Sequence, residues 1–130
     1  LPESTLRWHY RSRHEDLITF SNVKIYNNRL ITFPSIEGRK EDTGVEYVYV
    51  RDGVYDRGHR RDNVAEAIKV AELIFEHFKK YPKKSLGVIA FSEAQQQAIE
   101  NAVYEKRRNY PSFEKFFNEG NEEPFFIKNL

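Results

Sequence analysis

LGVIAFSEA, residues 86–94, is the stretch that decides the fold of this chain. A continuous apolar run such as its first six residues is typical of a strand that is buried on both faces. Ser92 follows the run, and serine is a preferred helix N-cap. The pattern therefore predicts a buried strand that turns directly into a helix, which we expect to cover about residues 93–107.

A helix precedes this strand, and a second strand follows later in the chain. The sequence NVAE, residues 63–66, is a capping box, and apolar residues recur at helical spacing from there to Pro82. Pro124 leads into a last apolar strand at residues 125–127. The order helix, strand, helix, strand favours a parallel sheet between helices. We therefore predict an α/β fold of three α/β/α layers with a mostly parallel sheet.

The first half of the chain carries weaker signals. We expect short strands at residues 6–10 and 30–33, with a helix at 15–26 between them. A polar surface loop at 35–44 is expected next. Two further strands, 45–50 and 54–55, are predicted around the Asp52-Gly53 turn. Beyond the predicted sheet, a second short helical piece is expected near residues 113–117.

Composition limits the function classes. The chain has 130 residues, which predicts a single domain over 1–130, and its net charge of +1 gives no warrant for nucleic-acid binding by overall charge. It has no cysteine, so disulfides, thiolate metal sites and thiol catalysis are excluded. We expect a cytoplasmic protein without membrane contact, because no apolar run is long enough to span a bilayer. The chain also lacks Met, so we expect it to be part of a longer protein.

An aromatic ring beside an arginine, Tyr10-Arg11, is the first candidate site. The ring offers a nucleotide base a flat face, and the guanidinium offers a phosphate a planar fork of donors. The alternative is a core tyrosine beside an arginine that pairs at the surface. The helix start from Ser92 to Gln95 is a second candidate, because free N–H groups there attract anions, and Phe91 can stack on a base. The alternative is that Ser92 only caps the helix and Phe91 only packs.

A basic run at residues 57–61 contains three arginines and a histidine. It could touch a phosphate backbone, but Asp56 and Asp62 flank it, and a solvated loop is the favoured interpretation. The four histidines show no ligand-like spacing, so no metal site is predicted. The chain also lacks a glycine-rich phosphate loop and a strand that ends in Asp-Glu.

Three stretches resemble superfamily 1 helicases of the Upf1-like branch. Residues 6–26 are similar to the motif IV region of these helicases. Residues 63–67 are similar to their Asn-x-x-Glu-Ala helix start, and residues 87–95 are similar to their strand-turn-helix that ends in Gln. In this order they resemble the second RecA-like domain, from motif IV to just before motif V. Two positions depart from the pattern, because Ala90 replaces a threonine and Ser12 replaces a frequent methionine.

The resemblance implies a partial RecA-like fold in a nucleic-acid-stimulated ATPase. Tyr10 would stack on adenine, and Arg11 would be catalytic at the γ-phosphate, while Phe91, Ser92 and Gln95 would contact single-stranded DNA or RNA. ATP and Mg²⁺ would be bound mainly by a first RecA-like domain of the same parent protein. This chain alone is then expected to be inactive and to hold no cofactor tightly.

A second reading is a non-catalytic α/β module that binds a nucleic-acid strand or a protein partner. The balanced charge and the many aromatic residues permit it. A nuclease would require acidic metal ligands grouped with a lysine, and the sequence offers no such group with any clarity. The choice between DNA and RNA, the direction of movement and the oligomeric state stay open.

Overall fold

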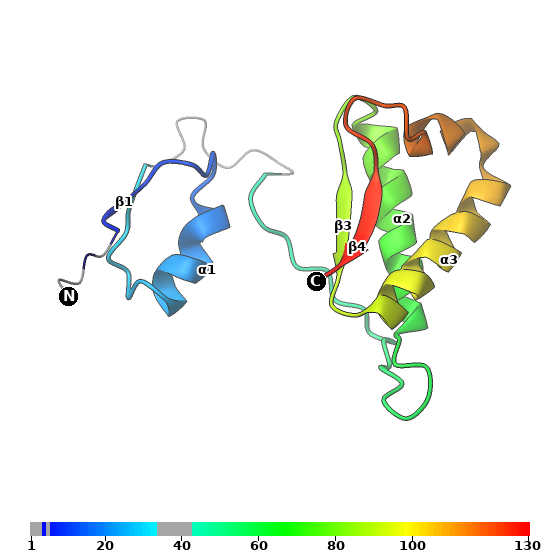
Figure 1. The fold of residues 1–130 in the computed structure, drawn as a ribbon, viewed down its shortest axis with the longest axis horizontal. Coiled ribbons are helices and arrows are strands. Elements are labelled where there is room, and N and C mark those ends of the chain that lie inside the picture. Colours follow the sequence, from blue (N-terminus) through cyan, green and yellow to red (C-terminus); the bar gives the residue numbers. More distant parts are fainter. Residues whose placement is uncertain (1–3, 5, 34–42) are drawn as a thin grey trace. The chain divides into compact units, whose positions relative to one another are not determined.

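A computed structural model describes residue 4 and residues 6–33 and 43–130 of the chain. The chain divides into two compact units, residues 1–48 and residues 49–130, which we call unit 1 and unit 2. Each unit has a two-stranded sheet of its own (Figure 1). That they belong to one domain over 1–130 stays a prediction.

Unit 1 contains the three elements that the sequence predicts between residues 6 and 33. They are β1 (Trp8–His9), α1 (Asp16–Lys24) and β2 (Ile31–Thr32). The two strands pair in parallel, and Trp8 lies opposite Ile31. The apolar residues of α1 stay largely exposed, with Phe20 at 72%. Unit 1 therefore consists of one helix and a short strand pair, and α1 buries none of its side chains in a core.

Unit 2 contains the strand–helix core of the prediction. Its elements are α2 (Val64–Lys80), β3 (Gly87–Ala90), α3 (Glu93–Asn109), the 3-10 helix η1 (Pro111–Phe117) and β4 (Phe126–Asn129). The strands β3 and β4 pair in parallel along their full length, from Gly87 opposite Phe126 to Ala90 opposite Asn129. Figure 1 shows α2 and α3 running beside this strand pair. The predicted parallel α/β class is confirmed.

Both long helices begin at the predicted caps. The Asn63 Oδ1 accepts a hydrogen bond from the Glu66 N–H at 3.2 Å, and the Ser92 Oγ accepts one from the Gln95 N–H at 3.2 Å. Each cap satisfies an N–H group that the helix itself leaves unpaired. The turn between β3 and α3 is thus fixed by local chemistry that the sequence already contains.

The core of unit 2 forms where α2 and α3 meet the strand pair. Its buried side chains come from both helices and from the end of β3: Ala67, Ala71, Ile74, Phe75, Phe78, Ala90, Ala98, Ile99 and Val103. At one end the rings of Phe78 and Phe116 stack with centroids 4.7 Å apart and planes 2° apart. Small residues on the facing helices allow close packing, and the stacked rings add apolar contacts at this end of the core.

The expectation that β3 is buried on both faces is wrong for unit 2. Val88 and Ala90 face the helices, whereas Ile89 on the other face is 53% exposed. Unit 2 therefore shows two of the three predicted layers. On the exposed face the Phe126 ring lies directly over Gly87, where an added Cβ would come within 2.3 Å of the ring. The missing side chain of Gly87 thus leaves the space that the Phe126 ring occupies.

The two strands predicted around the Asp52-Gly53 turn are absent. Residues 45–50 and 54–55 are irregular, although the Gly53 N–H does donate to the Val50 oxygen at 3.2 Å and closes the turn. Aromatic and β-branched residues favour strands only when a neighbouring strand supplies the ladder, and the described residues offer none here. Most of the predicted loop, residues 35–42, lies outside the described residues.

Candidate functional site

In unit 1, Tyr10 and Arg11 lie on the turn that directly follows β1. The Tyr10 side chain is 84% exposed, and Arg11 is exposed as well. The alternative interpretation of Tyr10 as a core residue therefore does not hold in the described structure. An exposed ring beside an exposed guanidinium can present a stacking face and a phosphate donor to the same ligand.

The turn is closed by hydrogen bonds between His9 and Ser12, the residues on either side of this pair. The Ser12 N–H donates to the His9 Nε2 at 3.1 Å, and the Ser12 Oγ lies 2.8 Å from the same nitrogen. These contacts fold the backbone so that both intervening side chains point outward. This contact was not predicted from the sequence, although the three-residue spacing of a histidine ring and a serine is compatible with such a turn.

A second side chain ties α1 to the strand pair of unit 1. The Asn22 Nδ2 donates to the Leu30 oxygen at 3.1 Å, and the Asn22 Oδ1 accepts from the Leu30 N–H at 3.0 Å. The next N–H, that of Ile31, donates to the Arg7 oxygen at 2.8 Å. The helix, β2 and β1 are thus linked in series up to the turn that carries Tyr10.

In unit 2, Phe91 and Ser92 lie at the carboxyl end of β3. Phe91 is 91% exposed, so its ring is free for stacking and contributes little to the core. Ser92 caps α3 as described above, which accounts for its hydroxyl in the structure. The carboxyl ends of parallel strands are where α/β folds place their ligands. The position suits the predicted nucleic-acid contact.

Gln95 is engaged in a contact that the sequence did not reveal. Its Oε1 accepts from the Asn63 N–H at 2.6 Å, and its Nε2 donates to the Asn63 oxygen at 3.1 Å. In a capping box the third helical residue closes back onto the cap N–H, and here a glutamine from another helix takes that place. The amide of Gln95 thereby joins the start of α2 to the start of α3. Asn63 and Gln95 lie 32 residues apart, so the local sequence around either residue does not indicate this contact.

The structure thus brings Phe91, Ser92 and Gln95 together at one turn of unit 2, and Tyr10 and Arg11 at one turn of unit 1. Within the described part of the chain, no group of three or more His, Asp or Glu side chains could hold a metal ion. No helix over the described residues is long and apolar enough to cross a membrane.

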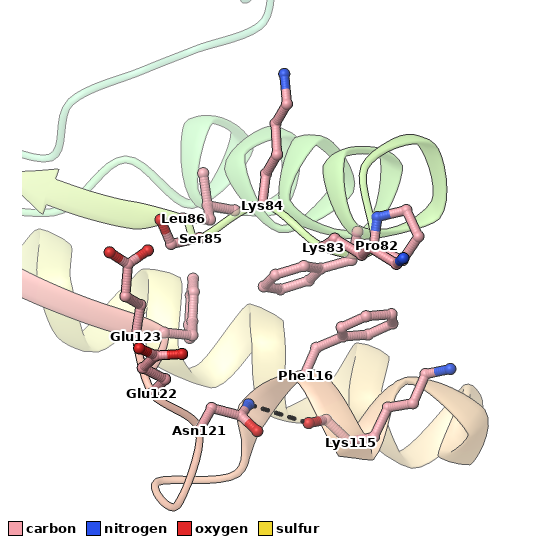
Figure 2. A pocket seen from close by; sticks show the side chains of 12 residues that line it. Pro82, Lys83, Lys84, Ser85, Leu86, Lys115, Phe116, Asn121, Glu122 and Glu123 are labelled. Carbon is pink, nitrogen blue, oxygen red and sulfur yellow. Dashed lines mark hydrogen bonds between the residues drawn. The ribbon is translucent and has the colours of Figure 1, made fainter.

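A pocket of about 600 Å³ lies at the opposite edge of unit 2, at the amino ends of β3 and β4. Figure 2 shows Lys83 and Lys84 on one side of it, Glu122 and Glu123 on another, and the Phe116 ring among them. The Asn121 Nδ2 donates to the Lys115 oxygen at 3.2 Å and holds the chain beside the pocket. None of the predicted site residues lines it.

Two curated proteins are similar to almost the whole chain. One, from Mycoplasma genitalium, is named "Uncharacterized ATP-dependent helicase MG140" and is 32% identical over 96% of this chain. The other, from Mycoplasma pneumoniae, is named as its homolog and is 29% identical over 96% of this chain. The chain spans only 11% of the length of either relative. It is thus related to a segment of proteins that are named ATP-dependent helicases.

No protein-family model matches the chain. No solved structure is significantly similar to it.

Proposed function

We propose that this chain is part of an ATP-dependent helicase or translocase, in which it supplies one side of the ATP site and part of the surface for a single strand. The observation that carries the proposal is the similarity, over nearly the whole chain, to relatives named ATP-dependent helicases. The exposed Tyr10-Arg11 pair supports the proposal, because its ring can stack on a nucleotide base and its guanidinium can bind a phosphate.

The proposed role of Arg11 is electrostatic. Negative charge spreads over the phosphoryl oxygens in the transition state, and an arginine brought in from a second domain stabilises it. Among the described residues Arg11 has no carboxylate partner, so its guanidinium fits a phosphate without first breaking an ion pair. ATP and Mg²⁺ would be held mainly by the first RecA-like domain, and Tyr10 would stack on the base.

The proposed strand surface lies at the carboxyl end of β3. Phe91 would stack on a base, and the backbone near Ser92 would approach the phosphates. Closure of the two motor domains on ATP would shift this surface along the strand, and opening after hydrolysis would reset it. Stacking and backbone contacts carry no base readout, so we expect no sequence preference.

The test is the ATPase activity of the full-length protein with and without single-stranded DNA or RNA, for wild type and Arg11→Ala. Loss of an arginine that stabilises the transferred phosphoryl group lowers turnover by about 10³-fold or more. We expect a loss of that size in Arg11→Ala, with the folded state retained.

Arg13→Ala is the matched control, because Arg13 is also exposed and lies two residues further along the chain. It should leave strand-stimulated turnover unchanged. Unchanged turnover in Arg11→Ala would show that Arg11 is not at the phosphates. A wild-type protein without any strand-stimulated activity would favour the non-catalytic binding module instead.

A further inference from the structure

The basic run that the sequence suggested to be a solvated loop is held in a fixed conformation. We call residues 56–62 the arginine loop. The Asp56 N–H donates to the Asp62 oxygen at 3.0 Å, and the Arg61 N–H donates to the Asp56 oxygen at 2.8 Å, so the loop is closed at its base. Inside it, the Asp56 carboxylate accepts the backbone N–H groups of His59 and Arg60, each at 3.2 Å.

These contacts engage the acidic groups of the arginine loop but do not involve the side chains of two of its arginines. Asp62 is buried and pairs with Arg60, whose Nε lies 3.3 Å from the Asp62 Oδ2. Arg57 and Arg61 are exposed, and neither guanidinium has a carboxylate partner among the residues that the structure describes. The flanking aspartates therefore do not neutralise these two arginines by direct pairing.

The backbone at Arg61 is unusual for an arginine. Its φ is 56°, in the left-handed region where glycine or asparagine is favoured. A long cationic side chain in this conformation costs stability that a glycine would not, and such residues concentrate at binding sites. The hydrogen bond from the Arg61 N–H to the Asp56 oxygen holds this conformation within the loop.

The arginine loop is anchored at the edge of the sheet where the proposed strand surface lies. Asn63 directly follows the loop, and both polar groups of its backbone are bound by the Gln95 amide from the first turn of α3. That turn begins at Ser92, beside the exposed Phe91. In Figure 1 the loop extends beyond the starts of α2 and α3.

We propose that Arg57 and Arg61 contact the phosphodiester backbone of the single strand, and that Gln95 is a positioning residue that holds the arginine loop at this surface. The inference rests on the proposed function, since it extends the same strand surface. Guanidinium groups match phosphate oxygens with two parallel donors, and a loop fixed beforehand loses little entropy on binding.

The test measures how strongly the full-length protein binds a single-stranded oligothymidylate as salt is raised. Each phosphate contact by a cation adds ~0.7 to the slope of log affinity against log salt concentration for single strands. We expect the Arg57→Ala/Arg61→Ala variant to bind more weakly at low salt, with a slope less steep by ~1.4. Lys79→Ala/Lys83→Ala is the matched control, because it removes the same charge near the C-terminal end of α2 and should leave the slope unchanged.

Gln95→Ala tests the positioning role. It should lower the slope in the same direction. It should add nothing further in the Arg57→Ala/Arg61→Ala background, because Gln95 acts only through the phosphate contacts of those two arginines. Gln97→Ala, which removes a side chain of α3 that bonds only to Asn101 among the described residues, should leave the slope as in wild type. A Gln95 with a purely structural role would lower the unfolding midpoint but keep the wild-type slope.

The outcomes separate this inference from the proposed function. If wild type binds the strand and the slope is the same in the arginine variant, the arginine loop is not part of the surface, while the helicase proposal stands. If Gln95→Ala keeps the wild-type slope, the positioning role is overturned. If wild type does not bind the strand at all, both proposals fail, and a protein partner becomes the better explanation for the arginine loop.

Discussion

At the scale of the residue, the two phenylalanines Phe78 and Phe91 show how differently one residue type can be used. Phe78 is 4% exposed and packs its ring against those of Phe116, Phe117 and Phe125. Phe78→Ala should lower the free energy of unfolding by about 3–5 kcal/mol, because it removes a buried ring and leaves a cavity. The change is measured by urea unfolding of the chain.

Phe91→Ala is the control, since Phe91 is 91% exposed. It should change the free energy of unfolding by no more than about 0.5 kcal/mol. An equal loss of stability in both variants would mean that Phe91 packs in the folded protein, which would also weaken its assignment to the strand surface.

Residue by residue, local chemistry was predictable and long-range chemistry was not. Asn63 and Ser92 were predicted as caps because a cap needs only its own helix start. The partner of Gln95 lies 32 residues away, and it could not be read from a window of neighbouring residues. The contacts of Asp56 could not be predicted for a different reason. Its carboxylate accepts hydrogen bonds from backbone N–H groups, which occur in every loop and leave no pattern in the sequence.

At the scale of the element, helices were predicted better than strands. Apolar residues at helical spacing identified α2 and α3 within a few residues of their observed ends. Residues 45–50 are rich in β-branched and aromatic residues and were predicted as a strand, yet no strand forms there. A helix satisfies its hydrogen bonds internally, whereas a strand depends on a neighbour that the local sequence does not specify.

The junction of α3 and η1 carries an ion pair whose strength should depend on pH. The Arg107 Nε donates to the Glu114 Oε2 at 3.0 Å, and a second guanidinium nitrogen bonds to the other carboxylate oxygen. The hydrogen bond from Arg107 lowers the pKa of the Glu114 carboxyl below its ordinary value of 4.5, and the carboxylate in turn raises the pKa of Arg107. The pair therefore stabilises the folded state above pH 4.5, and this contribution is lost as pH falls through the lowered pKa of Glu114.

Glu114→Gln should accordingly lower the urea midpoint at neutral pH and have no effect in acid below the lowered pKa. The loss should be small, because the pair is exposed and screened by solvent. Glu119→Gln, which removes an exposed carboxylate with no cationic partner in the described residues, serves as the control. A deficit in Glu114→Gln that persists unchanged into acid would show that the variant acts through packing rather than charge.

At the scale of the whole molecule, the candidate groups are divided between the two units. Tyr10 and Arg11 belong to unit 1, and Phe91, Ser92 and the arginine loop belong to unit 2. The α/β class followed from the order of elements along the chain. The division into units did not, because composition and length alone predict one domain of this size.

The 130 residues by themselves lack the groups that bind and activate a nucleoside triphosphate. The sequence lacks a glycine-rich phosphate loop, and the described residues offer no cluster of acidic side chains for a metal ion. One arginine and one ring can complete an ATP site but do not bind and activate the triphosphate alone. The purified chain should therefore show no ATPase activity above background, while the full-length protein hydrolyses ATP under the same conditions. Robust hydrolysis by the purified chain, lost in Arg11→Ala, would place a complete site within these residues and overturn the proposal that the chain supplies only one side of it.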